Sequence, residues 1–478
     1  MSNKRLAISG AKWTTFSTLI NTILQFGQVA ILARLLDPSS FGIVSVNMLL
    51  ITFLGIFAHF GFSNSIVYKQ ESDRRVLSTI YGLNLIIGFG MFFVIFFASP
   101  LLVMYYKEPR LLEVLRLSAF YFPIVFLGQI YGILLEMNLR FKAIAVIEIV
   151  SAIIGTSTTI VFAYNGFEAK SLIIGLLTAQ SIKVVAQNIV GRKMFSPQLF
   201  FNLRLAKDHL RFGIVNIGDS LLGFANSNMD TIIIGGLLGV KELGYYTIAA
   251  QIAIYPVARI CPLILQICYP IMAKMNENVE QLKRAYLQIV DFLSFCNIPL
   301  LIGLFMVAGN VVPLIYGEGW EPTVPLIKIF IFTSIFSCLA FPLSTVAYSR
   351  GKPSLLFYLS LVTLAIKFPL IYVFARMYGI YGIAYGILIS SFVSLMLNFF
   401  FVHQMVGSYF KSLMKNLFKP AVFSLIMSLF IITYKEVVGN EGLMHTLIQI
   451  LIGGAVYGIL TLKFKIGLSE IRSLRKAN

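Results

Sequence analysis

The sequence contains 478 residues, of which 58% are hydrophobic and only 12% are charged, and its mean hydropathy is +0.86. Soluble proteins carry about a quarter of their residues as charged side chains, so this composition excludes the water-soluble classes. The net charge of +18 would suggest nucleic-acid binding in a soluble protein. Here the basic residues lie between apolar segments, where they set membrane orientation instead. The sequence therefore predicts a polytopic membrane protein.

Apolar segments follow one another along the chain, each close to the roughly 20 residues that a membrane-spanning helix needs. We predict about 14 transmembrane helices, at residues 13–33, 41–62, 77–98, 111–134, 143–164, 170–190, 211–236, 244–268, 286–309, 323–347, 354–376, 380–403, 417–434 and 444–462. A β-barrel is excluded because its strands need only about 10 residues of alternating polarity, which these segments do not show. The expected fold class is all-α.

Lysine and arginine are distributed unequally between the two sides of the predicted membrane. The connections on the side of the N-terminus hold 26 of them, and the opposite connections hold seven. Positively charged connections stay in the cytoplasm, so both termini are predicted to be cytoplasmic.

An internal repeat relates the two halves of the chain. Residues 35–42 (LLDPSSFG) have an echo 202 positions later, at 237–244 (LLGVKELG), and residues 140–142 (RFK) have one 210 positions later, at 350–352 (RGK). Six predicted spans separate equivalent positions, so the halves have the same orientation and form a parallel repeat. We expect two six-helix bundles, at 1–200 and 201–405, followed by two additional helices and a cytoplasmic tail at 406–478.

Three predicted helices carry a polar stripe along one face, at the spacing of 3, 4 and 7 residues that defines a helix side. The stripes are Thr14, Thr18, Asn21, Gln25 and Gln28; Asn216, Asp219, Gly223, Asn226 and Asp230; and Gln251, Tyr255, Arg259 and Gln266. Such faces avoid lipid, because an unsatisfied polar group there costs several kcal/mol. They favour a water-filled cavity, and interhelical hydrogen bonding is the alternative.

Charged residues deep inside spans are the strongest candidates for function, since each costs about 2.5–3.5 kcal/mol on insertion. They are Arg259, Lys367, Asp219 and, a few turns outward, Asp230. The alternative is that these charges form structural ion pairs. For Lys367 the sequence supports a structural ion pair and a functional role equally.

Other charges are interpreted from their position near span ends. Lys183 can extend its ammonium group to the cytoplasmic interface, and Glu148 lies about two turns from that face. Glu113 and Arg116, three residues apart, can pair with each other.

The sequence lacks the motifs of several enzyme classes. It has no GxxxxGK[ST] segment for ATP hydrolysis and no GxSxG or HExxH motif. Its four cysteines, Cys261, Cys268, Cys296 and Cys338, have neither disulfide nor zinc spacing and are predicted to be small buried hydrophobic residues. The chain is therefore expected not to be an enzyme and to hold no metal.

Three segments carry a resemblance to a known family: LARLLDPSSFG (32–42, with the preceding helix), GFSNSIV (61–67) and LRFKAIAVIEIVSAIIG (139–155). They resemble bacterial polysaccharide exporters of the lipopolysaccharide, colanic acid and teichuronic acid type. These exporters belong to the multidrug/oligosaccharidyl-lipid/polysaccharide (MOP) flippase superfamily.

The resemblance implies a V-shaped pair of bundles, like that of the MATE transporters, around a cationic cavity. It implies a flippase of the bacterial inner membrane that moves a polyprenyl-pyrophosphate-linked oligosaccharide by alternating access. In that setting Arg259 would bind pyrophosphate, and Lys367 and Arg34 would add positive potential to the cavity. Its polar lining would include Asn21, Gln25, Asn226 and Gln251. Asp219 and Asp230 would carry a coupling ion or act as counter-ions.

No cofactor is implied beyond that ion, H+ or Na+. Partners would be the lipid-linked substrate, membrane lipids and polysaccharide-assembly proteins such as a polymerase, without nucleic acid. A drug/cation antiporter of the same fold is the main alternative, and a membrane-embedded glycan polymerase or ligase is the enzyme alternative.

Overall fold

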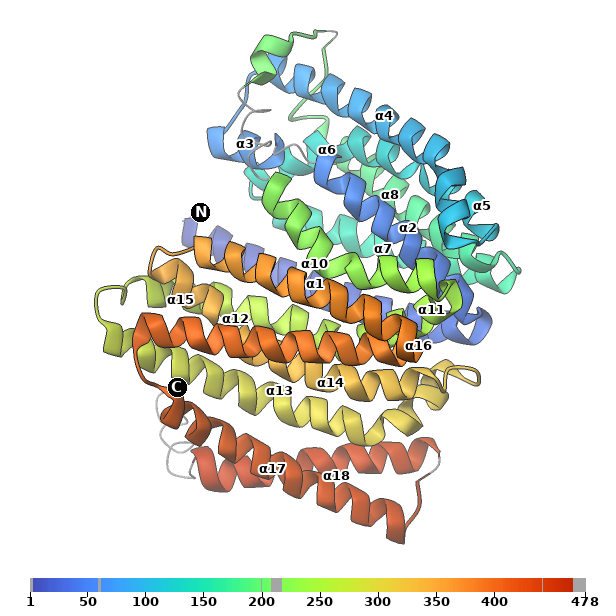
Figure 1. Ribbon diagram of the computed structural model, residues 1–478. Helices are drawn as coiled ribbons and strands as arrows, with labels where there is room; N and C mark the ends of the chain where they lie inside the picture. The colour runs from blue at the N-terminus through green and yellow to red at the C-terminus, as the bar shows by residue number, and fades with distance from the viewer. Residues whose placement is uncertain (1–2, 59–61, 199, 208–216, 441, 467–478) are drawn as a thin grey trace. The chain divides into compact units, whose positions relative to one another are not determined.

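The computed structural model describes residues 3–58, 62–198, 200–207, 217–440 and 442–466, apart from the side chains at some helical positions. Within these ranges every regular element is a helix (Figure 1). The helices are α1 (Asn3–Leu35), α2 (Pro38–Ala58), α3 (Phe62–Lys69), α4 (Arg74–Tyr106), α5 (Arg110–Ser118), α6 (Tyr121–Met137), α7 (Phe141–Tyr164), α8 (Glu168–Gly191), α10 (Ile217–Leu237), α11 (Val240–Ala253), α12 (Tyr255–Ala273), α13 (Val279–Tyr316), α14 (Thr323–Ala340), α15 (Leu343–Ser349), α16 (Ser354–Val406), α17 (Phe410–Val437) and α18 (Leu443–Thr461), followed by a π-helical turn, Leu462–Ile466.

The all-α membrane fold predicted from the sequence is confirmed. Among the described residues, 11 helical segments are long and apolar enough to cross a bilayer. Within the described residues each predicted span lies in one helix or in two consecutive ones, and α16 holds two spans, so the arrangement is consistent with about 14 spans. Residues 59–61 of the second predicted span and 211–216 of the seventh lie outside the described residues. A backbone in hydrocarbon must satisfy its hydrogen bonds internally, which is why long apolar segments take this form.

Helix α16 contains two predicted spans in one 53-residue element. Its backbone leaves helical geometry at Gly379, where φ is 59° and ψ is −141°. Residues that carry a Cβ rarely adopt this backbone conformation, whereas glycine, which has none, adopts it readily. The break separates the two spans that the sequence predicts on either side of residues 377–379.

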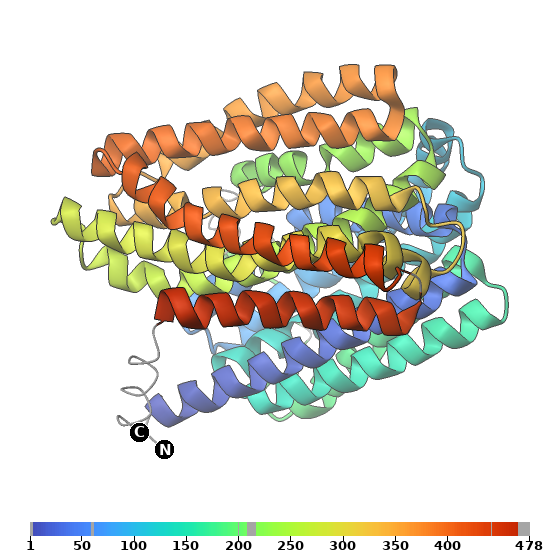
Figure 2. The same ribbon diagram turned by 90° about the horizontal axis from the view of Figure 1, so that it is seen from below.

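The chain forms two compact units, Met1–Gly244 and Tyr245–Asn478. In the first unit α1 lies beside α7, and α7 packs along α8 (Figure 2). The described part of the polar segment after α8 folds back onto the same unit: Phe195 is buried against Ile80 and Tyr131. The three-part division predicted from the sequence stays a prediction, because compactness alone does not say which helices move together.

The two copies of the repeated motif cross each other within the first unit. A Cβ added to Gly42 would lie 1.8 Å from the carbonyl oxygen of Val240, and one added to Gly244 would lie 1.8 Å from that of Pro38. Glycine is therefore the residue that lets the N-terminal turns of α2 and α11 approach this closely. The pairing matches the 202-residue offset at both positions.

In the second unit, α17 and α18 pack on α13 (Figure 1). Pro299 of α13 has no N–H, so it leaves the carbonyl of Phe295 without its helical donor. The hydroxyl of Tyr457, from α18, donates to that carbonyl at 3.1 Å. Near the other end of the contact, Asn310 donates to Asn440. Polar contacts thus fix the C-terminal pair of helices on α13.

The cysteines follow the sequence prediction in part. All four are free thiols, and Cys261 and Cys338 are buried. Cys296 is exposed and Cys268 is partly exposed, so the prediction that all four are buried was wrong for these two. In a membrane protein an exposed apolar position can face lipid, and an apolar sequence context therefore does not imply burial in protein.

Candidate functional site

A polar track runs through the first unit between α1, α7 and α8; we define it as Ser17, Asn21, Gln28, Glu148, Thr156 and Lys183. At one level, Thr156 donates a hydrogen bond to Oε1 of Gln28 at 3.0 Å. At another level, Ser17 donates to Oε2 of Glu148 at 3.4 Å. Between them on α1, Oδ1 of Asn21 is buried and accepts no hydrogen bond from the described residues. The stripe predicted on the first span therefore faces other helices over part of its length.

The track contains an ion pair inside membrane-spanning helices. Nζ of Lys183 lies 3.7 Å from Oε1 of Glu148, and each side chain is 34% exposed. Glu148 is seven residues into α7 and Lys183 eight residues before the end of α8, which places both about 11–12 Å from the helix ends. Glu136 of α6 lies close enough to interact electrostatically with both. The ion pair itself is formed by Glu148 and Lys183.

This pair changes the interpretation of Lys183. The sequence suggested a lysine that reaches the membrane interface, but its ammonium group contacts a carboxylate of the neighbouring helix. An ion pair lowers the cost of placing both charges within the span. The signal was available in the sequence as two opposite charges at similar depth on consecutive spans. The sequence prediction relied on the position of Lys183 near a span end and did not consider a partner on the preceding span.

The predicted site residues on α10 and α11 are buried to different degrees. Asp230 is 7% exposed and Gln251 is 8% exposed. Asn226 is partly buried, and its side-chain amide donates to the carbonyl of Leu222 one turn earlier at 3.3 Å. A carboxylate that acts inside a membrane protein must be shielded from lipid, and the burial of Asp230 meets this requirement.

The remaining predicted residues lie on four helices. On α1, Gln25 and Arg34 are exposed, and Arg34 lies in the last turn, where the helix dipole favours a positive charge. Lys367 is partly buried in the first half of α16. Positions 219 and 259 lie on α10 and α12, but the side chains of Asp219 and Arg259 are outside the described residues. A cavity shared by these residues stays a prediction.

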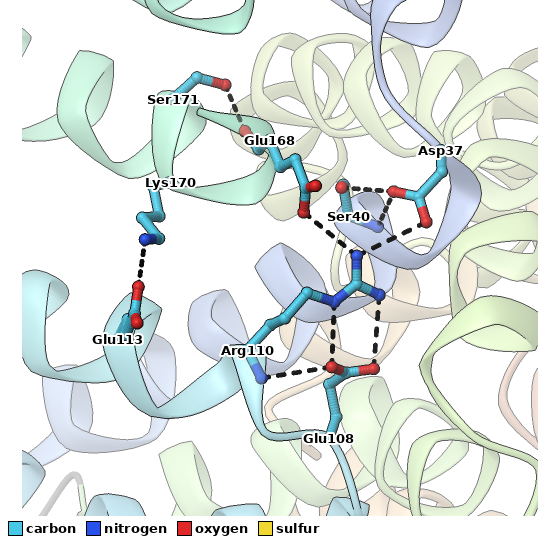
Figure 3. A network of polar contacts seen from close by, with 8 residues as sticks. All are labelled: Asp37, Ser40, Glu108, Arg110, Glu113, Glu168, Lys170 and Ser171. Carbon is cyan, nitrogen blue, oxygen red and sulfur yellow. Dashed lines mark hydrogen bonds and ion pairs between the residues drawn. The ribbon is translucent and has the colours of Figure 1, made fainter. Parts of the chain in front are cut away.

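One end of the first unit holds a network of charges around Arg110 (Figure 3). Its guanidinium lies 3.0 Å from Glu108, 3.3 Å from Glu168 and 3.7 Å from Asp37. These carboxylates come from the α4–α5 connection, the first residue of α8 and the α1–α2 connection. Arg110 therefore ties together the turns at this end of the unit.

Asp37 also begins α2. Its carboxylate accepts hydrogen bonds from the backbone N–H and the hydroxyl of Ser40, and Pro38 occupies the first helical position, where a missing N–H costs nothing. Burial acts to raise the pKa of Asp37, but the hydrogen bonds from Ser40 and Ser39 and the charge of Arg110 outweigh it. They hold the pKa below its ordinary value of 3.8.

The expected pair of Glu113 and Arg116 does not form. Glu113 pairs with Lys170 of α8 instead (Figure 3), and the guanidinium of Arg116 lies over the ring of Phe96, 4.9 Å from its centroid. Within α5 the two side chains are close enough to meet, so tertiary packing overrides the local preference.

No group of three or more His, Cys, Asp or Glu side chains in the described ranges could hold a metal ion. What this geometry offers is membrane-embedded polar and charged side chains on packed helices. Such groups can solvate a polar substrate or ion inside a bilayer.

Comparison with known proteins identifies the family. Residues 31–325 match the family described as "Polysaccharide biosynthesis protein". The chain belongs to this family. It is 27% identical over 426 residues to lipopolysaccharide biosynthesis protein WzxC of Escherichia coli (strain K12). The alignment covers 89% of this chain and 87% of the relative.

A second relative supports the same branch of polysaccharide biosynthesis proteins. Teichuronic acid biosynthesis protein TuaB of Bacillus subtilis (strain 168) is 27% identical over 423 residues, which is 88% of each chain. Among solved structures, the lipid II flippase MurJ in an inward closed conformation superposes with a TM-score of 0.76 at 15% identity, covering 98% of this chain and 100% of that one. The resemblance predicted from the motifs is confirmed, and the MurJ likeness shows the shared fold.

Proposed function

We propose that this polysaccharide biosynthesis protein is a flippase that moves a lipid-linked oligosaccharide from the cytoplasmic to the outer leaflet of a bacterial inner membrane. The observation that carries the proposal is the polar track with its Glu148–Lys183 pair inside membrane-spanning helices. An oligosaccharide headgroup needs hydrogen-bonding partners on its way through hydrocarbon, and such a track supplies them. Relatives that act in lipopolysaccharide and teichuronic acid biosynthesis support the substrate class.

The proposed mechanism is alternating access with both termini in the cytoplasm. The headgroup enters from the cytoplasmic side while the lipid tail stays in the membrane, and a conformational change then exposes the headgroup outside. Arg259 is the proposed pyrophosphate ligand, because a guanidinium can form paired charge-assisted hydrogen bonds with phosphate oxygens. Lys367 and Arg34 would add positive potential, and Asn21, Gln25, Asn226 and Gln251 would bind sugar hydroxyls.

Coupling to a proton or sodium gradient is part of the proposal. Asp219 and Asp230 remain candidates for the coupling ion, and the burial of Asp230 suits that role. Released substrate would pass to a polymerase or another assembly protein on the outer side. The protein is a transporter in this account and carries out no bond-forming step.

Reconstitution tests the proposal. Purified protein in vesicles should move a fluorescent polyprenyl-pyrophosphate oligosaccharide from the inner to the outer leaflet, where an external quencher reaches it. Arg259→Ala should abolish this movement while Arg259→Lys retains part of it, since lysine keeps the charge but not the paired hydrogen bonds. Movement of a cationic drug in place of the lipid would support the antiporter alternative. Lengthening or transfer of the glycan without an ion gradient would support the enzyme alternative.

A further inference from the structure

Two lysines of the second unit meet at the same stretch of α13. The ammonium group of Lys328, from α14, lies 5.5 Å from the ring centroid of Phe305. The ammonium group of Lys435, from α17, donates a hydrogen bond to the carbonyl of Met306. The two lysines thus contact consecutive residues of α13, Phe305 and Met306. We call this arrangement the lysine pair.

The lysine pair differs from the three cations of the first unit whose ion pairs are described above. Lys183 and Lys170 each have a carboxylate, and Arg110 has three. Within the described ranges, no carboxylate lies within 4.0 Å of either Lys328 or Lys435. Two like charges held together without a counter-ion favour the binding of an anion between them.

The depth of the pair limits what that anion can be. Lys328 is five residues into α14 and Lys435 two residues before the end of α17; both helices belong to candidate membrane spans. These positions are about 8 Å and 3 Å from the helix ends, which is the depth of lipid headgroups. Lysines at such a level bind anionic lipid through charge.

The geometry also distinguishes the pair from two freely extended lysines. Lys435 turns toward the backbone of α13, so its ammonium group is held in place. One hydrogen-bond donor is used there and two remain. Lys328 is exposed, and its ammonium group lies beside the partly buried ring of Phe305. A fixed donor beside a second, exposed cation is suited to a phosphate group.

We propose that Lys328 and Lys435 bind the phosphate of an anionic membrane lipid at this end of α13. The lipid is recognised by a phosphate ester that carries net negative charge and bridges the two ammonium groups. Its chains would lie along the exposed apolar faces of α14 and α17, where Phe332 and Phe430 point outward. The site lies wholly in the second unit and does not depend on the transport reaction proposed above.

The test measures lipid binding by the full chain and needs no transport. Purified protein is placed in nanodiscs of phosphatidylcholine with or without 10% phosphatidylglycerol, and tightly bound phosphatidylglycerol is counted by native mass spectrometry. Lys328→Met/Lys435→Met should lower the affinity by at least about tenfold, because charge-assisted contacts contribute about that much each. Lys411→Met/Lys415→Met is the matched control: it removes two exposed lysines from the other end of α17 and should leave the affinity unchanged.

Each other outcome contradicts the proposal. Equal losses in the two double variants would mean that only net charge attracts the lipid. Displacement of phosphatidylglycerol by millimolar inorganic phosphate would assign the pair to a free phosphate ion. Absence of a tightly bound lipid in the unmodified protein would remove the site altogether. If the double variant does not fold, the affinity for phosphatidylglycerol is measured in Lys328→Met alone. This exposed side chain makes no hydrogen bond that folding needs. Unchanged affinity in that variant would overturn the proposal.

Discussion

Gly42 and Gly244 occupy equivalent places in one reciprocal contact. Each would place a Cβ 1.8 Å from a backbone carbonyl oxygen of the other copy of the motif, on Val240 and on Pro38 respectively. The two copies are related by the 202-residue offset read from the sequence. A repeat in sequence therefore corresponds to a two-fold-like contact in the fold, and the glycines are what the contact requires.

Gly42→Ala is expected to destabilise the protein, because the added methyl group overlaps the carbonyl of Val240 and the helices must move apart. Overpacking of this kind costs about 1–3 kcal/mol. Thermal unfolding in detergent, followed by size-exclusion recovery, measures the effect. Gly55→Ala is the matched control on the same helix, since nothing lies within 4 Å of its added Cβ; equal stability of the two variants would contradict the close contact.

The ion pair of the polar track makes a prediction about coupling between two residues. Lys183→Met leaves Glu148 in the span without its ammonium partner and should lower the free energy of unfolding by about 1–3 kcal/mol. Because both side chains are partly exposed, we expect a value in the lower part of this range. Adding Glu148→Gln should recover much of the loss. A double-mutant cycle on thermal stability tests this, and simple additivity of the two single changes would show that they do not interact.

Asp37 predicts a pH dependence. Its pKa in the folded protein is depressed below 3.8, so the carboxylate stabilises the folded state above the unfolded pKa. That contribution is lost as the pH falls through the folded value. Asp37→Asn should therefore lower the melting temperature at pH 7, and its difference from the unmodified protein should shrink below about pH 4. A difference that stays constant from pH 7 to pH 3 would rule out a titrating role for this carboxyl.

Tyr457 makes a prediction about the C-terminal helices. Tyr457→Phe removes the hydroxyl that donates to Phe295 at 3.1 Å and leaves the carbonyl freed by Pro299 without this donor. The expected cost is about 1 kcal/mol. Replacing Pro299 with alanine in the same variant restores an N–H at that point and should offset the loss. If Tyr457→Phe is as stable as the unmodified protein, α18 does not depend on this contact.

Much of the fold follows from the sequence, because hydrocarbon admits few backbone arrangements. Within the described residues each predicted span is helical, and the break between residues 376 and 380 falls at Gly379. The interruption of the predicted span 244–268 between α11 and α12 was not expected as a helix end. Pro256 signals it, but proline is also tolerated within membrane helices, so the residue alone does not decide between the two outcomes.

The candidate site was predictable in part. The stripe on the first span was visible from helical spacing, and Gln28 does bond to a neighbouring helix. The partners were not visible, because one sequence does not show which face of α7 or α8 turns toward α1. For the same reason Glu113 was matched with Arg116 rather than with Lys170. Side-chain pairing between helices depends on their rotation and depth, which hydropathy does not encode.

The most direct test of the central claim is made in a strain that lacks this protein. Lipid-linked repeat units would be assigned to each leaflet of the inner membrane by external enzymatic labelling, together with the amount of surface polysaccharide. Our account predicts loss of the polymer with full-length repeat units trapped on the cytoplasmic leaflet, and recovery of both on complementation. Repeat units that reach the outer leaflet without being polymerised would contradict a flippase and favour the enzyme alternative.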